Sequence, residues 1–289
     1  MPIFTVPSSF EPQLAKDFLR KHAGISLTLW RKIKLLDTFC INQINVKPTT
    51  AIVNPNDVIS YTLEPQNSIL PMEMPLKIAY EDEYLLVIDK PAGQLVHPTT
   101  KEHTNTLANG VLAYYHNKNE HYDFHPVHRL DKNTSGLILI AKMPHIQHQL
   151  SLLGKNFHRT YLALVEGVLS PLKGTIDVPI KRHPNSIIQR IAALDGQKAV
   201  THYEVLKTNG TISFIELSLE TGRTHQIRVH LSSIGHPLLG DDLYGGSLDI
   251  ITRQALHASK LSFIHPITHQ ILYTYSKIPT DMQNIFNDL

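Results

Sequence analysis

The chain has 289 residues, of which 42% are hydrophobic and 18% charged, a composition that predicts a globular protein with one large domain and a small one. Cys40 is the only cysteine, which excludes an internal disulfide and a thiolate metal cluster and is typical of a reducing compartment. No apolar run of about 18 residues and no signal-peptide pattern occur, so a soluble cytoplasmic protein is expected. The net charge of +2 is too small to indicate a nucleic acid partner.

The first 72 residues are expected to form a small α/β unit. Residues 12–24 predict a helix that ends at Gly24, residues 28–39 predict a second helix, and short strands follow in "CINQINVKP" and "DVISYTL". The next stretch, "EPQNSILPMEMP", carries three prolines and little periodicity and is typical of a linker. We therefore expect a small domain over 1–72 and a larger one over 73–289.

The second predicted helix is amphipathic. Leu29, Ile33 and Leu36 share one face by the 3.6-residue period, and Arg31 and Lys34 lie roughly opposite. Between residues 16 and 34, six lysines and arginines stand against one acidic residue. Such a face could meet nucleic acid phosphates, and a solvated helix surface would explain the same charges.

From residue 76 onward, strand patterns dominate. They are found in "LKIAYEDEYLLVIDKP", "GLILIAK", "RTYLALVEG" and "GTIDVPI", and a hairpin turn is expected at Asn209 and Gly210. Helices are predicted in "NTLANGVLAYYH" and after Pro144. Because strands and helices do not alternate strictly, an α+β fold with a mixed, largely antiparallel sheet and flanking helices is expected.

The segment "HPVHRLDKNTSGLILIAK" places Asp131 just before a strand that is apolar on both faces. A carboxylate at the edge of a core stays ionised only with a cation or hydrogen-bond donors nearby. Arg129 is two residues away and on the same side of an extended segment. The sequence therefore predicts a polar site at this junction.

A second arginine is expected to come from "TGRTHQIRVHLSSIG". A helix from about Arg223 to Ile234 would end at Gly235 and place Arg223 on its inward stripe, with Arg228 about 140° away. Arg223 is thus the predicted partner of Asp131, either as a structural ion pair or as part of an active site.

Two simpler interpretations apply to other residues. Tyr161 alternates onto one face of its predicted strand and suits a core position. His125 and His128 could join Asp131 in a metal site, although the pattern is not specific. No Walker loop, dinucleotide loop or Gly-x-Ser-x-Gly elbow occurs.

Taken together, "VIDKPAGQLVHP", "HRLDKNTSGL", "RTYLALVEG" and "TGRTHQIRVH" resemble, in order and spacing, the RluA/RluD family of RNA pseudouridine synthases, over residues 76–266. The N-terminal unit is similar to the S-four-like RNA-binding module, with Gln43 where that module usually has a glycine in its turn. The resemblance implies the pseudouridine synthase fold, with Asp131 as the catalytic aspartate, Arg129 as the motif arginine, Tyr161 as the active-site tyrosine and Arg223 as the arginine that pairs with the aspartate.

The implied reaction isomerises uridine in RNA to pseudouridine and requires no cofactor and no metal. Large-subunit ribosomal RNA is the expected substrate, with tRNA as the alternative, and no protein partner or membrane is expected. A non-catalytic RNA-binding protein and a metal-dependent hydrolase are the remaining alternatives. The side chains expected to contact RNA are Arg20, Arg31, Lys34, Lys90, His128, Thr134 and Arg228.

Overall fold

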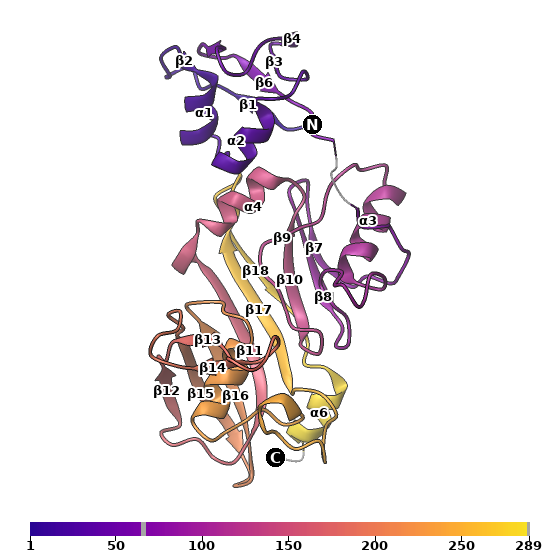
Figure 1. Cartoon of the computed structure of the whole chain (residues 1–289), viewed down its shortest axis with the longest axis vertical. Helices are drawn as coiled ribbons and strands as arrows, with labels where there is room; N and C mark the ends of the chain where they lie inside the picture. Colours follow the sequence, from indigo (N-terminus) through magenta and orange to yellow (C-terminus); the bar gives the residue numbers. More distant parts are fainter. Residues whose placement is uncertain (65–67, 288–289) are drawn as a thin grey trace.

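The fold is taken from a computed structural model, in which residues 1–64 and 68–287 are described. The chain forms an elongated molecule with the N-terminal unit at one end of its long axis and helix α6 (Thr280–Asn287) near the other (Figure 1). Among the described residues, no helix is both long and apolar enough to cross a membrane.

The N-terminal unit has its own core. Phe18, Leu19, Trp30 and Ile33, from two short helices, pack against a small antiparallel sheet of order β1-β6-β3-β4. The turn between β3 and β4 uses Asn42 and Gln43, which both have positive φ, so this turn is made without glycine. The elements are β1 (Ile3–Thr5), β2 (Gln13–Leu14), α1 (Ala15–Lys21), α2 (Leu27–Ile33), β3 (Cys40–Ile41), β4 (Ile44–Asn45), β5 (Ile52–Val53) and β6 (Val58–Ser60).

The helix bounds differ from the predicted ones. Both helices are shorter than the periodic patterns, because α1 ends before Gly24, which has a positive φ, and α2 ends before a turn at Lys34. The division at residue 72 remains a prediction, although the small core and the core of the large sheet are built from different residues.

The large domain is built on a ten-stranded sheet. Its main path is β12-β15-β16-β11-β17-β10-β8-β7, with β18 paired to β17 and β9 paired to β10. The predicted mixed, largely antiparallel sheet is confirmed, since among the described pairings in this sheet only β10 with β17 is parallel. The strands are β7 (Ile78–Glu81), β8 (Leu85–Lys90), β9 (His125–Pro126), β10 (Ser135–Ala141), β11 (Phe157–Glu166), β12 (Lys173–Ile176), β13 (Ile180–Arg182), β14 (Arg190–Ala192), β15 (Thr201–Thr208), β16 (Ile212–Leu219), β17 (Leu256–Ile264) and β18 (Ile271–Tyr275).

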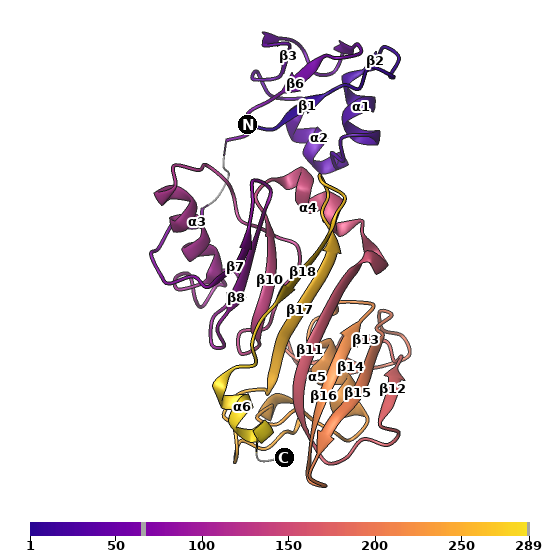
Figure 2. The same cartoon turned by 180° about the vertical axis from the view of Figure 1, so that it is seen from behind.

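Helices cover separate parts of this sheet. The main core joins α3 and α5 to the sheet through Leu107, Val111, Ile227 and Leu231, whereas α4 lies between the sheet and the N-terminal unit (Figures 1 and 2). The predicted buried strand is confirmed, because every residue of β10 is buried. The helices are α3 (Leu107–Asn117), α4 (Pro144–Ser151), α5 (Gln226–Ser233) and α6 (Thr280–Asn287), with short 3₁₀ turns η1 (Gly154–Asn156) and η2 (Asp242–Tyr244).

The parallel contact between β10 and β17 is short and depends on Gly136. The pairing covers only Ser135 with His257 and Gly136 with Ala258. Gly136 has a φ of +107°, and a Cβ there would lie 2.2 Å from the carbonyl oxygen of Ala258. Glycine is therefore required where the two strands come closest, a few residues after Asp131.

We expect Gly136→Ala to lower the free energy of unfolding by about 2 to 4 kcal/mol, because it adds a left-handed backbone penalty to a backbone clash. Urea denaturation would measure this as a lower midpoint. Gly210→Ala is the matched control, since Gly210 has a φ of +94° but open space around its Cβ position. Equal losses in the two variants would contradict a role for the close contact.

Candidate active site

Asp131 lies in the loop 128–134, which leads into β10, and its side chain is 26% exposed. The loop is closed by a backbone hydrogen bond from Thr134 N to the Asp131 carbonyl, 3.1 Å. At its start, the Leu139 amide donates to His128 Nε2 over 3.1 Å. The predicted position of Asp131, at the rim of the core and partly out of water, is what the structure shows.

Lys90 and Arg253 each donate to one backbone carbonyl of this loop from outside it. Lys90, with no exposed surface, donates from Nζ to the carbonyls of Pro91, Gln94 and Lys132 at 2.7, 2.9 and 3.1 Å. Arg253 donates to the Asn133 carbonyl over 3.3 Å. Burial lowers the pKa of Lys90 to about 7, while Asp131 opposes that shift and three acceptors match the three protons of an ammonium group.

The cation that pairs with Asp131 is Arg228. Its Nη1 donates to Asp131 Oδ2 over 3.1 Å, and its Nε and Nη2 donate to the two oxygens of Asp241, both over 2.8 Å. Arg228 is 7% exposed and Asp241 is 1% exposed. The two carboxylates raise the pKa of Arg228 against the opposing effect of burial, so a fixed positive charge stands beside Asp131.

The predicted pairing of Asp131 with Arg223 is wrong. Helix α5 begins at Gln226, and His225 before it has a left-handed backbone with a φ of 57°. The helical period therefore cannot be extended back to Arg223, which is exposed and donates from Nε to the Lys198 carbonyl. No described contact joins Arg223 to Asp131, and the helix instead directs Arg228 inward.

Tyr161 and Arg129 differ in exposure, since Tyr161 is nearly buried and Arg129 is exposed. Tyr161, in β11, is 5% exposed and shares the main core with Ala163 and Val165, as the alternation predicted. Burial raises the pKa of its phenol, and Asp131 is among the charges that act on it. Arg129 is exposed. Burial is the main cause that lowers the pKa of His97, and the positive charge of Arg129 lowers it further.

The predicted RNA-contacting residues divide by burial. Lys90 and Thr134 are buried, with Thr134 Oγ1 accepting from Gln254, so both are wrong as surface contacts and instead support the loop. Arg228 is likewise committed to two carboxylates. His128 is half-buried with Nε2 already bonded. On the N-terminal unit, Arg31 and Lys34 are exposed and Arg20 is half-buried.

The histidines considered as metal ligands do not gather around Asp131. His125 pairs with Ala141 at the far end of β10, and His128 accepts a backbone hydrogen bond. Among residues 1–64 and 68–287, no three His, Cys, Asp or Glu side chains come together in a way that could hold a metal ion.

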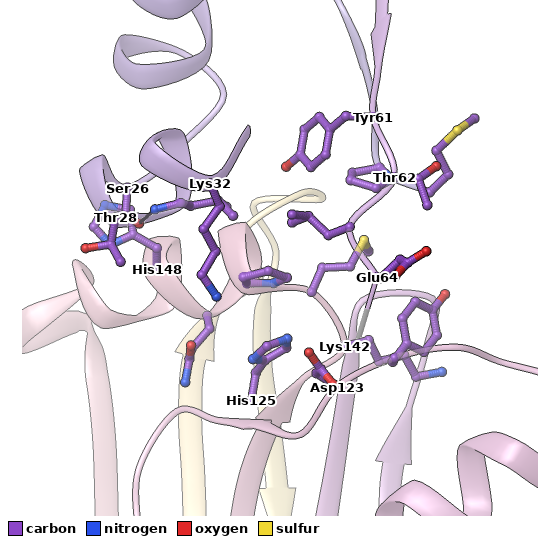
Figure 3. A pocket seen from close by; sticks show the side chains of 18 of the residues that line it. Ser26, Thr28, Lys32, Tyr61, Thr62, Glu64, Asp123, His125, Lys142 and His148 are labelled. Atoms are coloured by element: carbon purple, nitrogen blue, oxygen red, sulfur yellow. Dashed lines mark hydrogen bonds between the residues drawn. The ribbon is translucent and has the colours of Figure 1, made fainter. Parts of the chain in front are cut away.

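A cavity of about 790 Å³ lies between the N-terminal unit and the large domain (Figure 3). It is lined by Lys32, Tyr61, His125, Lys142 and His148, among others, at the end of β10 away from Asp131. Seven strand residues separate the two ends, which corresponds to roughly 20 Å. Lys142, one of the cations that line the cavity, forms an ion pair with Glu81 over 2.8 Å, so its charge is already neutralised. Neither Asp131 nor Arg228 lines this cavity.

Comparison with known proteins identifies the family of this chain. Residues 84–233 match the family model described as RNA pseudouridylate synthase. The chain belongs to that family. It is 44% identical to the RNA pseudouridine synthase YjbO of Bacillus subtilis, over 80% of each chain. It is 35% identical to the ribosomal large subunit pseudouridine synthase D of Neisseria meningitidis, over all of this chain and 80% of that protein.

Solved structures agree with the fold of an RNA pseudouridine synthase. The human RNA pseudouridylate synthase domain containing 4 superposes with a TM-score of 0.61 and 25% identity, covering 73% of this chain and 92% of that one. The human domain containing 1 gives a TM-score of 0.56 over 75% and 97%. The predicted α+β pseudouridine synthase fold and the predicted enzyme class, an RNA pseudouridine synthase, are thus confirmed.

Sequence reasoning gave no role to three residues of this synthase that contact Arg228 or lie near Asp131. Asp241 anchors Arg228, the Tyr244 ring lies 4.9 Å from the Arg228 guanidinium carbon, and His225 Nε2 lies 3.9 Å from Asp131 Oδ2. The segment "LGDDLYGG" carried a signal, since two adjacent acids between glycines are unusual beside an apolar "HPLL" run. The partner of Asp241, however, is Arg228 on helix α5, which precedes this segment in the sequence. Which side of that helix faces inward could be assigned only once its first residue was known.

We expect Arg228→Gln to lower the free energy of unfolding by about 3 to 5 kcal/mol, because it leaves the Asp241 carboxylate buried without its cation. Arg223→Gln should change it by less than about 0.5 kcal/mol, as an exposed substitution. Urea midpoints of the two purified variants test this directly. The opposite order would restore Arg223 as the partner of Asp131.

Acid should destabilise the protein through His128. Burial, with Arg159 nearby, lowers the pKa of His128 to about 3, against about 6.5 in the unfolded chain. Its neutral form therefore favours the folded state above pH 6.5, and that stability is lost as the pH falls from 6.5 toward 3. By pH 4.5 the loss should be roughly 3 kcal/mol.

The measurement is the urea midpoint at pH 7.5, 6.0 and 4.5. His128→Gln keeps an acceptor for the Leu139 amide but cannot be protonated, so its midpoint should fall less steeply below pH 6.5. His116→Gln, at an exposed position in α3, serves as the control. A fall of the same size in His128→Gln as in the unsubstituted protein would refute the assignment to His128.

Proposed function

We propose that Asp131 is the group that acts on the sugar of the target uridine, and that the target lies in large-subunit ribosomal RNA. The observation that carries this is the Asp131–Arg228 pair, a partly exposed carboxylate beside a buried, permanently charged guanidinium. The described hydrogen bond to the carboxylate uses Oδ2. Oδ1 is therefore left to face a bound nucleotide.

The reaction sets clear demands on such a group. The bond between C1′ and N1 of uridine breaks, the base turns, C1′ joins C5, and the proton lost from C5 is balanced by one gained at N1. An ionised carboxylate can attack C1′ or remove a proton from C2′, and both routes use the same oxygen. Arg228 supports either route, because it favours the charged form of Asp131 in a partly dry site.

Tyr161 and Arg129 are proposed to handle the base and the RNA backbone. The Tyr161 ring belongs to the sheet face that holds the main core, and its side chain is nearly buried, which suits a fixed platform against an extracted base. Arg129 is exposed within the proposed catalytic loop, residues 128–134, and suits a phosphate or the position vacated by the base. Arg31 and Lys34 on α2 would add backbone contacts from the N-terminal unit.

The proposed substrate follows from the relatives and from the cost of base extraction. Proteins named ribosomal large subunit pseudouridine synthase D from Nitrosomonas europaea and Zymomonas mobilis are 44% and 42% identical to this chain. Unstacking a base costs a few kcal/mol, and the cost is lowest in loops and bulges of a structured RNA. A ribosomal RNA substrate would place the activity in the cytoplasm, and tRNA is the second candidate.

Asp131→Asn should abolish tritium release from C5-labelled uridine in RNA, a loss of at least about 1,000-fold, because the amide can neither attack nor accept a proton. RNA binding, followed by filter retention, should survive. Asp242→Asn, which removes an exposed carboxylate next to Asp241, is the matched control and should retain turnover. Substantial turnover by Asp131→Asn would sink the catalytic assignment and favour a different role for the loop.

The substrate is tested by mapping pseudouridines across all RNA in cells that lack the gene and in cells complemented with either the unsubstituted protein or Asp131→Asn. At least one large-subunit ribosomal site should disappear and return only with the unsubstituted protein. Loss of tRNA sites alone would favour tRNA. A growth defect rescued equally by Asp131→Asn, with no site changed, would indicate a non-catalytic RNA-binding role.

A further inference from the structure

His225 lies between the loop 128–134 and Tyr244, and the proposed isomerisation gives it no role. Its Nε2 lies 3.9 Å from Asp131 Oδ2, its Nδ1 lies 2.8 Å from the Tyr244 hydroxyl, and 12% of its side chain is exposed. Its backbone is left-handed, with φ 57° and ψ 21°, and its side chain does not cap helix α5. A non-glycine residue is uncommon in this region, and such positions gather at functional sites.

Hydrogen-bond counting assigns the ring protons. The Tyr244 oxygen accepts from the Arg190 amide over 2.9 Å, and its single proton is satisfied by donating to His225 Nδ1. The neutral imidazole then carries its proton on Nε2, the atom nearest Asp131. The reverse arrangement would leave the Tyr244 proton without an acceptor among its described partners.

The charges around His225 come from four segments. Asp131 in the catalytic loop and Asp241 before η2 favour a charged ring, whereas Arg228 of α5 and Arg190 of β14 oppose it. Burial is the largest influence and lowers the pKa of His225. At neutral pH the ring is therefore a neutral N–H donor aimed at a carboxylate.

We propose that His225 is a positioning residue that donates from Nε2 to Asp131 Oδ2 in the complex with RNA, so that His225 and Arg228 together hold this oxygen and turn Oδ1 toward the sugar. This inference rests on the proposed role of Asp131. The present separation of 3.9 Å is about 1 Å longer than a hydrogen bond, and catalytic hydrogen bonds commonly tighten only when substrate is bound. Tyr244 acts one step further out by fixing the tautomer.

Two substitutions separate this role from a structural one. In His225→Gln, the side-chain amide can present an N–H near the position of Nε2. In His225→Asn, the shorter amide reaches only the position of Nδ1 and loses the donor toward Asp131. Asparagine tolerates the left-handed backbone better than glutamine does, so the stability order and the predicted activity order are opposite.

The experiment measures single-turnover tritium release from C5-labelled RNA, RNA affinity and urea midpoints for the full-length variants. We expect His225→Asn to be the more stable variant but about 10- to 100-fold slower than His225→Gln, the size of one hydrogen bond to a charged group. Tyr244→Phe should slow the reaction by a few-fold at unchanged RNA affinity, because it frees the tautomer while the ring remains over Arg228.

Rates that follow stability, with His225→Asn faster than His225→Gln, would overturn the proposal and leave His225 as a turn residue. Equal rates in the two variants would also overturn it. These outcomes differ from failure of the proposed function, which would appear as turnover by Asp131→Asn whatever the His225 variants do. Lower RNA affinity without a change in single-turnover rate at saturating enzyme would assign His225 to substrate binding and reject positioning.

Discussion

The burial of Arg228 is the constraint around which the loop 128–134 is arranged. A guanidinium that is 7% exposed requires carboxylates, and Arg228 has two. Asp241 takes two of its donors and has almost no surface left, so it can only be structural. Asp131 takes one donor and keeps about a quarter of its side-chain surface. One cation therefore supports two carboxylates that differ in accessibility, and the more accessible one, Asp131, is the carboxylate proposed to react.

The loop around Asp131 gains its shape from contacts to its backbone. Lys90 and Arg253 donate to the carbonyls of two consecutive loop residues, Lys132 and Asn133, and Gln254 donates to the Thr134 hydroxyl. Gly136 then lets β10 and β17 approach closely enough for both strands to support the same segment. Because these partners come from β8 and from the segment before β17, residues far apart in the sequence determine one short loop.

The sequence indicated the loop that holds Asp131 but not the side chains that contact Asp131 and the loop. The apolar run of β10 and the polar residues before it marked Asp131, since a two-sided buried strand and a carboxylate at its edge are both visible in local patterns. The partner arginine was missed because a helical period was continued through His225, whose left-handed backbone resets the phase. Lys90 was predicted to contact RNA, and only tertiary contacts reveal the three carbonyls around it. The enzyme class was predicted from the family resemblance, because local sequence patterns alone did not indicate it.

The buried amino group of Lys90 has a consequence for how the protein responds to its ionic surroundings. It donates to three carbonyl groups and is covalently attached, so it cannot be exchanged for a cation from solvent. The loop geometry is thereby insulated from the salt concentration. RNA capture through exposed cations, in contrast, weakens steeply as salt rises. Ionic strength should thus separate the two stages, acting on how often RNA arrives and hardly at all on the shape of the site that receives it.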